Sequence, residues 1–394
     1  MAGSTPRQNT GVTADVVVIG AGAVGAAVAW FAAREGLRVA VVDRGPIAGG
    51  TSSAGEGNVL VSDKEPGPEL DLALLAQRVW RGDLAEHAAL WEFEAKGGLV
   101  VAATARSVTA LAGLTRRQRA HGVGVTDVPE GELTAYEPYL APELAGGAFY
   151  PQDAQVQPML VVAHLLRLSR RSGATVTTGA EVTGFLRRGD TVTGVRTTRG
   201  DIGAAMVVNA AGPWAGSVSE LAGAPVPVLP RRGVVLVTQP LPPMVRHKVY
   251  AAEYVGDVAS SDAALQTSPV VESTPAGTVL IGSSRERVGF DRTIPPEVPA
   301  TLARKAVALF PRLAQALALR TYFGFRPYCP DHLPVIGPDP RAPGLWHACG
   351  HEGAGIGLSV ATGKLLAQAM TGRDTELDLT PFAADRFAAA PPVP

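Results

Sequence analysis

Residues 15–43 constrain the fold of this chain more than any other stretch, because three regular elements follow one another there in a diagnostic order. Residues 15–19 (DVVVI) are typical of a fully buried strand. The alanine-rich residues 21–35 predict a helix, and residues 37–43 (LRVAVVD) predict a second strand that is parallel to the first. This order is that of a βαβ unit, so the chain is expected to have an α/β fold.

A glycine pattern, Gly20-Ala-Gly22-Ala-Val-Gly25, stands between the first strand and the helix. Gly20 allows the tight turn, Gly22 lets the backbone approach a pyrophosphate, and Gly25 lets the helix pack closely on the strand. The N-terminus of the helix offers free N–H groups to the phosphates. Asp43 ends the second strand, eighteen residues after Gly25, where its carboxylate can accept hydrogen bonds from ribose hydroxyls. These features predict a dinucleotide site and leave FAD and NAD both open.

The loop that follows the second strand favours FAD. Between Gly49 and Asn58 it reads GGTSSAGEGN. Small and hydroxyl-bearing residues let a backbone run close to a long ligand and donate hydrogen bonds along it. A nicotinamide enzyme has no need of such a second loop. The alternative is an ordinary flexible loop, which would not usually carry so many small residues directly after the ribose aspartate.

At this point the chain resembles the glycine oxidase/D-amino acid oxidase (DAO) superfamily of FAD-dependent flavoenzymes. Within it, the chain looks most similar to the subunits of hydroxyproline and proline dehydrogenases, opine oxidases and hydrogen cyanide synthase. Three later segments extend the resemblance over nearly the whole chain: residues 209–215 (NAAGPWA), 324–337 (GFRPYCPDHLPVIG) and 348–357 (ACGHEGAGIG).

The resemblance implies a role for each of these segments. The first is similar to the family's second dinucleotide segment. An ordinary buried strand followed by a turn would have the same sequence features and is the alternative. In the second, an arginine at the position of Arg326 holds the substrate carboxylate, since a guanidinium fork matches a carboxylate with two parallel hydrogen bonds. A structural arginine is the alternative. In the third, a helix that begins near Leu358 would point its N-terminus at the flavin and stabilise the negative charge of the reduced ring.

Together these segments predict a cofactor site and several substrate contacts. The residues expected to bind FAD are Gly20, Gly22, Ala23, Val24, Gly25, Asp43, Arg44, Thr51, Ser52, Glu56, Gly57, Asn58, Val182, Ala211, Gly212, Trp214, Gly350, His351, Gly353, Ala354, Gly355, Ile356 and Gly357. Tyr250 and Tyr254 are candidate substrate contacts beside Arg326, with core or interface tyrosines as the alternative. Cys329 lies nearer the Pro-Asp motif than the position at which some relatives attach flavin, so FAD is expected to be non-covalent.

The fold implied is α/β, with a Rossmann-like FAD-binding domain interleaved with an antiparallel-sheet substrate domain. The FAD-binding domain would comprise residues 14–85, 150–222 and 325–388, and the substrate domain residues 86–149 and 223–324. Residues 1–13 and 389–394 are expected to be flexible ends.

Composition and spacing argue against several other classes of protein. With 35 basic and 36 acidic residues and no long run of either sign, the chain has no electrostatic footprint for nucleic acid. Residues 16–33 carry no charge, but the glycines within them argue against a membrane span. The two cysteines cannot form a disulfide framework and suit a reducing cytoplasm. No further ligand completes a metal site around His347 and His351. Ser52 and Ser53 lack the GxSxG elbow of a hydrolase.

What the resemblance implies for function is oxidation of the C–N bond of a small amino or secondary (imino or N-alkyl) amino acid, by hydride transfer to flavin N5. Glycine oxidases carry a second arginine where this chain has Gly353, which makes glycine itself a less favoured substrate. Sarcosine oxidases carry a lysine where this chain has Leu280, which favours a dehydrogenase that uses a quinone or another acceptor. The alternatives are an oxygen-using oxidase, a flavin-bearing subunit of a heteromeric complex with no turnover of its own, and an NAD(P)-dependent dehydrogenase.

Overall fold

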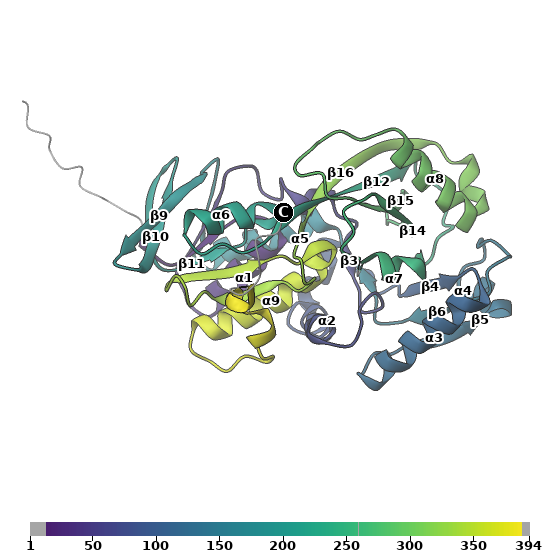
Figure 1. Cartoon of the computed structure of the whole chain (residues 1–394), viewed down its shortest axis with the longest axis horizontal. Helices are drawn as coiled ribbons and strands as arrows, with labels where there is room; N and C mark the ends of the chain where they lie inside the picture. The colour runs from purple at the N-terminus through teal and green to yellow at the C-terminus, as the bar shows by residue number, and fades with distance from the viewer. Residues whose placement is uncertain (1–12, 259, 388–394) are drawn as a thin grey trace, which may run out of the picture.

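The computed structural model describes residues 13–258 and 260–387 (Figure 1). The flexible ends expected at residues 1–13 and 389–394 lie outside these ranges, apart from Thr13, which begins the first strand. Two eight-stranded sheets lie next to each other along the long axis of the molecule, and helices cover both (Figure 1). The α/β fold class is confirmed.

The first sheet contains the βαβ unit expected at the N-terminus. Its main strands, in spatial order, are β17 (Val335–Pro338), β18 (Leu345–Cys349), β11 (Gly200–Asn209), β1 (Thr13–Ile19), β2 (Val39–Asp43) and β8 (Thr175–Thr178). β1 pairs in parallel with β2 and β11, which in turn pair in parallel with β8 and β18. An antiparallel ribbon continues from β11 and consists of β9 (Val182–Arg188) and β10 (Thr191–Thr197).

Four helices pack together on this sheet: α1 (Ala23–Arg34), α2 (Pro68–Arg81), α5 (Pro158–Arg171) and α9 (Gly355–Met370). α1 is rich in alanine and is buried almost all round, as expected of a helix without a polar face. α9 crosses it closely at Gly363, where an added Cβ would lie 2.6 Å from the carbonyl carbon of Ala27. Both helices begin at the cavity described below.

The second sheet is antiparallel except for one pair. Its strands, in spatial order, are β16 (Ala318–Tyr328), β12 (Leu229–Thr238), β15 (Val279–Arg285), β14 (Gln266–Ser273), β13 (Lys248–Ala251), β4 (Gly98–Ala102), β6 (Gly146–Tyr150) and β5 (Thr126–Pro129). β13 and β4 form the parallel pair. α8 (Glu297–Leu309) packs on β12, β14 and β15, and α3 (Ala105–Ala120) packs on β4, β5 and β6. The other described elements include α4 (Leu133–Tyr136), α6 (Ala215–Leu221), α7 (Glu253–Val258), β3 (Asn58–Val59) and β7 (Ala154–Gln155).

The two sheets are interleaved along the chain. Strands from residues 13–43, 175–209 and 335–349 form the first sheet, and strands from residues 98–150 and 229–328 form the second. One apolar cluster extends from α1 and α9 through α2 to Tyr250 and Val270 in the second sheet, so the two halves share a core. The domain limits given above stay a prediction.

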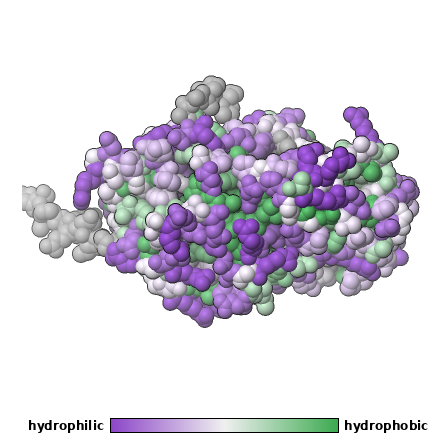
Figure 2. Space-filling model, turned by 90° about the horizontal axis from the view of Figure 1, so that it is seen from below, coloured by the Kyte–Doolittle hydropathy of each residue, from purple (hydrophilic) through white to green (hydrophobic). Residues whose placement is uncertain are grey.

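The face seen from below is mostly hydrophilic, and its apolar residues gather toward the middle (Figure 2). Across residues 13–258 and 260–387, the structure has no helix that is both long and apolar enough to cross a bilayer.

Candidate active site

A cavity of about 490 Å³ lies where the two sheets meet. On the side of the first sheet it is bordered by the ends of β1 and β2 and by the start of α1. On the other side it is bordered by β12 and β16 of the second sheet. Ligands of open α/β sheets bind at the carboxyl ends of the strands, so this is the place at which a dinucleotide is expected.

The glycine pattern forms one end of the cavity. Gly20 has a φ of +115°, and an added Cβ would lie 2.3 Å from the carbonyl oxygen of Ala210. Gly25 lies outside the lining, because it lets α1 pack on the turn: its added Cβ would lie 2.0 Å from the Gly20 carbonyl oxygen. Gly22 borders the cavity as the N-cap of α1, whose first turn has no acidic residue. An added Cβ at Gly22 would lie 3.2 Å from the Ser52 hydroxyl oxygen, so a larger side chain would crowd this turn at the edge of the cavity.

Asp43 and its neighbours continue this end of the cavity. The Asp43 carboxylate accepts hydrogen bonds from the backbone N–H groups of Ala21 and Gly45, both at 2.7 Å. The guanidinium of Arg44 lies 4.1 Å from the ring centre of Trp214, and both residues line the cavity. These contacts fix the Asp43 carboxylate at the mouth of the cavity, where each of its oxygens keeps a lone pair for a ribose hydroxyl.

The small-residue loop joins the two sides of the cavity. The Ser52 hydroxyl oxygen accepts a hydrogen bond from the Ala23 N–H at 3.0 Å and thereby caps α1. The Thr51 hydroxyl donates to the Phe325 carbonyl oxygen on β16. At the far end of the loop, the buried Lys248 ammonium donates to the Asn58 side-chain oxygen and lies 3.8 Å from the Glu56 carboxylate. The loop is therefore tied to α1 and to the second sheet while its backbone borders the cavity.

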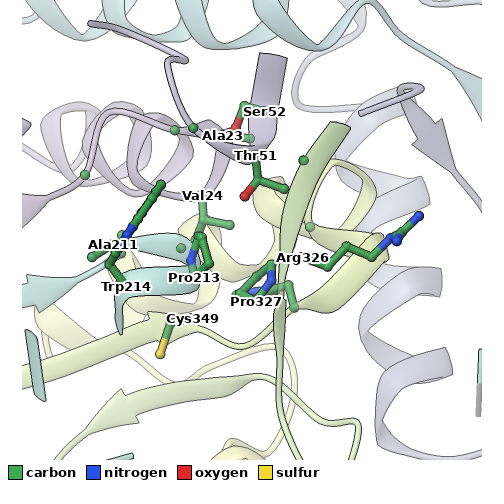
Figure 3. Close-up of a pocket in the computed structure, with 18 of the residues that line it drawn as sticks. Ala23, Val24, Thr51, Ser52, Ala211, Pro213, Trp214, Arg326, Pro327 and Cys349 are labelled. Atoms are coloured by element: carbon green, nitrogen blue, oxygen red, sulfur yellow. Dashed lines mark hydrogen bonds between the residues drawn. The ribbon is translucent and has the colours of Figure 1, made fainter. Parts of the chain in front are cut away.

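Arg326 lies on β16 at the end of the cavity opposite Trp214 and Ala211, and its side chain extends away from them (Figure 3). Its Nη1 donates to the Ser284 carbonyl oxygen at 2.8 Å. Among the described residues, no carboxylate forms an ion pair with this guanidinium. Burial, together with the positive charge of Arg285, lowers the pKa of Arg326 to about 10, so it remains charged at neutral pH. The Nε and Nη2 edge is thus available to a carboxylate ligand.

The two candidate tyrosines differ in position. Tyr254, on α7, lines the cavity and is only 8% exposed. Tyr250, on β13, is not part of the lining: it is fully buried, and its hydroxyl donates to the Ser62 hydroxyl. Its ring packs edge-on against that of Tyr254, with centroids 5.0 Å apart. Tyr254 therefore borders the cavity, whereas Tyr250 lies in the core behind it, and the role of Tyr254 as a substrate contact stays a prediction.

Most of the other predicted residues do border the cavity. The predicted cofactor residues in the lining are Gly20, Gly22, Ala23, Val24, Asp43, Arg44, Thr51, Ser52, Glu56, Asn58, Val182, Ala211, Gly212, Trp214, His351, Gly353, Gly355 and Ile356. Those outside it are Gly25, Gly57, Gly350, Ala354 and Gly357. Close backbone packing explains two of these: an added Cβ would lie 1.8 Å from the Val156 carbonyl oxygen at Gly57 and 2.9 Å from that of Asn58 at Gly357.

Several lining residues were not predicted. They include Gly45, Pro46, Gly49, Gly50, Ala54, Gly55, Ala180, Glu181, Pro213, Ser217, Gly233, Val235, Gly324, Pro327, Cys349 and Glu352. Those between Gly49 and Gly55 belong to the small-residue loop, and its composition was the signal that could have found them. Gly233 and Val235 carry no such signal, because β12 reaches the cavity only through its pairing with β16.

The Gly-rich segment before α9 borders the same cavity. Burial lowers the pKa of His351 to about 3, so its imidazole is neutral, and Nε2 lies 2.9 Å from the Thr362 hydroxyl. Cys349 lines the cavity, whereas Cys329 does not. Burial raises the pKa of both thiols, which argues against a thiolate that attacks a ligand. In the part of the chain that the structure describes, no cluster of three His, Cys, Asp or Glu residues is arranged to hold a metal ion.

Comparison with known proteins decides the family. A family model described as FAD dependent oxidoreductase (DAO) matches residues 15–369. The chain belongs to this family. Glycine oxidase of Pseudomonas aeruginosa is 32% identical to this oxidoreductase over 93% of this chain and 98% of its own length. Hydrogen cyanide synthase subunit HcnC of the same species is 35% identical, over 66% of this chain and 59% of that subunit.

Solved structures share the fold of this oxidoreductase over its length. The crystal structure of glycine oxidase from Geobacillus kaustophilus superposes with a TM-score of 0.86 at 28% identity, over 95% of this chain and 99% of that one. L-Proline dehydrogenase from P. horikoshii superposes with a TM-score of 0.87 at 23% identity, over 96% of this chain and 98% of that one, which shows a common fold.

The cofactor of this oxidoreductase is FAD, and the cavity fits it. The α1 N-terminus and the backbone at Gly22 both border the cavity, and no acidic residue lies in the first turn of α1, which suits a pyrophosphate. Asp43 suits the ribose, and the long small-residue loop lines the path from there toward Arg326. The family assignment sets aside the alternative of an NAD(P)-dependent dehydrogenase.

Proposed function

We propose that this oxidoreductase oxidises the C–N bond of an amino or secondary amino acid whose carboxylate binds Arg326. The observation that carries the proposal is a guanidinium without a carboxylate partner among the described residues, at the end of the FAD cavity away from Asp43. An unpaired buried cation is costly, so such a position is best explained by an anionic ligand. The relatives named glycine oxidase and L-proline dehydrogenase support an amino acid as that ligand.

The residues of the chain act by positioning. FAD, when bound, would supply the acceptor for the hydride of the carbon next to the amine. Arg326 holds the carboxylate with its Nε and Nη2 edge while the Ser284 carbonyl fixes Nη1. Pro327 restricts the backbone of Arg326 to an extended conformation, as its place in β16 requires. Tyr254 covers the same end of the cavity and excludes water from it. The resulting imine is hydrolysed by water or cyclises.

The choice of substrate and acceptor rests on two positions. Gly353 lies beside Arg326, with its added Cβ 3.5 Å from Nε, so this position contributes no second cation there. The space favours a substrate larger than glycine. Leu280, on β15, stands where a sarcosine oxidase would have a lysine, which favours an acceptor other than oxygen.

A second candidate is a flavin-bearing subunit of a larger complex. The similarity to HcnC, whose name makes it a subunit, favours this alternative. Assay of the isolated chain with an artificial electron acceptor separates the two: turnover by the chain alone supports an independent dehydrogenase.

Substitution of Arg326 tests the proposal. Removing one partner of a buried ion pair costs roughly 3–5 kcal/mol, so Arg326→Leu should lower kcat/KM by about a hundred- to several-thousand-fold. Arg326→Lys should recover little, because a point charge cannot form the two-pronged contact. Bound FAD should be unchanged in both variants. Anaerobic reduction of the flavin by a panel of amino and N-alkyl amino acids is the measurement, and near-normal reduction by Arg326→Leu would assign this arginine a structural role.

A further inference from the structure

One carboxylate in the lining of the cavity contacts an imidazole. Glu352, in the Gly-rich segment before α9, lines the cavity, and its Oε1 lies 2.9 Å from Nδ1 of His332. An added Cβ at the next residue, Gly353, would lie 3.5 Å from Nε of Arg326, so Glu352 is at the Arg326 end. The His332 side chain is 23% exposed, and its Nε2 lies 2.9 Å from the hydroxyl oxygen of the exposed Ser261. Two side chains in contact therefore join the cavity to the surface.

Both members of the Glu352–His332 pair have an unusual backbone conformation. Glu352 has a φ of +46° and His332 a φ of +60°, in the left-handed region that glycine favours. Among the described non-glycine residues, only Ala48 and Glu92 share it. Backbone strain of this kind persists where the surrounding structure holds it, and it is concentrated at functional sites. Here the two strained residues follow β16 and β18, and they meet beside the cavity.

The other titratable groups near this end are less suited to pass a proton to solvent. Glu56 lines the cavity, but its carboxylate lies 3.8 Å from the ammonium of Lys248, which is only 1% exposed. His351 is 3% exposed, and burial keeps its imidazole neutral. Burial raises the pKa of the Cys349 thiol to about 12. Of these lining groups, the Glu352 carboxylate is the one in contact with a proton carrier that reaches solvent.

The two oxygens of the Glu352 carboxylate face different partners. Oε1 faces His332, and Oε2 lies 3.7 Å from Nη1 of Arg231, which is 1% exposed. Replacing Glu352 therefore also takes a carboxylate away from Arg231, whereas replacing His332 does not. The other charged and titratable groups packed around the pair are Glu69 on α2, Tyr328 on β16, the Asp331–Arg386 ion pair beside His332, and Arg285 and Arg287 near Arg231.

Oxidation of an amine needs a route for one proton. An alkylamine has a pKa of about 10, so at neutral pH it is almost entirely an ammonium ion. An ammonium nitrogen has no lone pair with which to form a C=N bond, so one N–H proton must leave before the hydride does. The hydrogen on carbon then goes to the cofactor with two electrons, and an iminium ion remains. The N–H proton has to reach solvent separately.

We propose that Glu352 and His332 carry the ammonium proton of the substrate from the cavity to solvent. This inference rests on the proposed function for an amine held at Arg326. As the N–H bond breaks, Glu352 Oε1 accepts the proton and passes it to Nδ1 of His332, and the exposed imidazolium releases it to water. Histidine suits the second step, because it is the residue type that exchanges protons most readily near neutral pH.

The pH dependence of flavin reduction tests the proposal. The FAD-containing protein is mixed anaerobically with a saturating amino acid at about pH 7 and about pH 9, where Arg326 is still largely charged. At about pH 7, His332→Gln should reduce the flavin about a hundredfold more slowly than the parent, as loss of a proton-transfer group implies. The neutral share of the amine rises about a hundredfold between these pH values, and the variant should recover most of its rate with it. A purely structural loss would lower both rates equally.

Two further variants sharpen this test. His332→Gly keeps the left-handed backbone at no steric cost and leaves room for free imidazole. Added imidazole should raise its rate at about pH 7 by about tenfold or more and leave the parent unchanged. His121→Gln is the matched control: His121 also contacts a carboxylate, that of Asp71 at 2.7 Å, but lies outside the cavity lining, so this variant should keep the pH profile of the parent.

A binding measurement without turnover shows where the defect lies. Isobutyrate has a carboxylate and no amine, and it is titrated by the change in flavin absorbance. Its affinity should be the same in the parent and in His332→Gln, because the proposed pair acts on the amine proton alone. Arg326→Gln should weaken it. Weaker binding of isobutyrate by His332→Gln would mean that His332 supports the carboxylate site instead.

The outcomes separate this inference from the proposed function. Parallel pH profiles of the parent and His332→Gln, or a His332→Gly rate that imidazole does not raise, would overturn the inference and leave the proposed function standing. If no amino acid reduces the flavin of the parent at either pH, the proposed function fails and the inference fails with it. Glu352→Gln should share the defect of His332→Gln, and the latter decides if Glu352→Gln does not fold.

Discussion

Replacing Gly233 by alanine should displace the Arg326 guanidinium and leave the fold intact. Gly233 lies on β12, opposite Gly324 of β16, and lines the cavity. An added Cβ would lie 2.0 Å from Nη1 and 2.6 Å from Cζ of Arg326. Since non-bonded heavy atoms stay about 3.5 Å apart, the guanidinium would have to move by roughly 1.5 Å. The atoms in conflict are the end of a flexible side chain, so the backbone need not shift.

The expected loss follows from that displacement. A misplacement of about 1 Å in a positioning group can lower a rate by about a hundredfold. Gly233→Ala should therefore lower kcat/KM by about a hundredfold or more, with bound FAD and thermal stability close to those of the parent. The measurement is anaerobic flavin reduction by the best substrate, with FAD quantified from absorbance.

Gly353→Ala is the matched comparison. Its added Cβ would lie 3.5 Å from Arg326 Nε, an ordinary contact. Its effect on kcat/KM should be at least about tenfold smaller than that of Gly233→Ala, because the guanidinium can stay in place. Equal activities of the two variants, or near-normal flavin reduction by Gly233→Ala, would refute the argument that the position of the Arg326 guanidinium limits activity.

Three other outcomes are expected. Gly22→Val should abolish FAD retention, because its side chain enters the pyrophosphate path, whereas Asp43→Ala should only weaken retention; a Gly22→Val protein as yellow as the parent would contradict this. Turnover with a dye or quinone should exceed turnover with oxygen, given Leu280, and rapid stoichiometric peroxide formation in air would exclude it. Burial raises the pKa of Asp153 from 3.8 to about 7, so the native state binds a proton that the unfolded chain releases. The free energy of unfolding should therefore fall by on the order of a few kcal/mol as pH rises from about 4 through 7, and Asp153→Asn should flatten this slope in thermal unfolding at about pH 5 and pH 8.

The dinucleotide end of the cavity could be predicted from sequence because its determinants are local. Gly20, Gly22 and Asp43 belong to one strand–turn–helix–strand segment, in which spacing alone fixes which groups face the ligand. The small-residue loop is also contiguous. For these parts of the molecule, the sequence already indicates which residues form the site, and the structure supplies the distances between them.

The substrate end could not be predicted in the same way, because distant segments meet there. Tyr250 and Tyr254 looked alike in the sequence. In the structure the chain leaves β13 at Ala251 and forms α7, which brings Tyr254 to the cavity and leaves Tyr250 in the core. Arg285 had no motif around it, and only the pairing of β15 and β14 beneath α7 places it under the Tyr254 ring.

β16 is the one described strand that carries Gly324, Arg326 and Pro327 to the cavity, and the Thr51 hydroxyl ties it to the cofactor loop. Under the proposed function, recognition of the substrate would depend on side chains of a sheet that contributes little to the dinucleotide end. Exchanges on β12, β15 and β16 can alter which molecule is oxidised while the nucleotide-binding segment stays the same. Under the proposed function, such a division would let the substrate change through few mutations on these strands, while Gly20, Gly22 and Asp43 keep their places at the dinucleotide end.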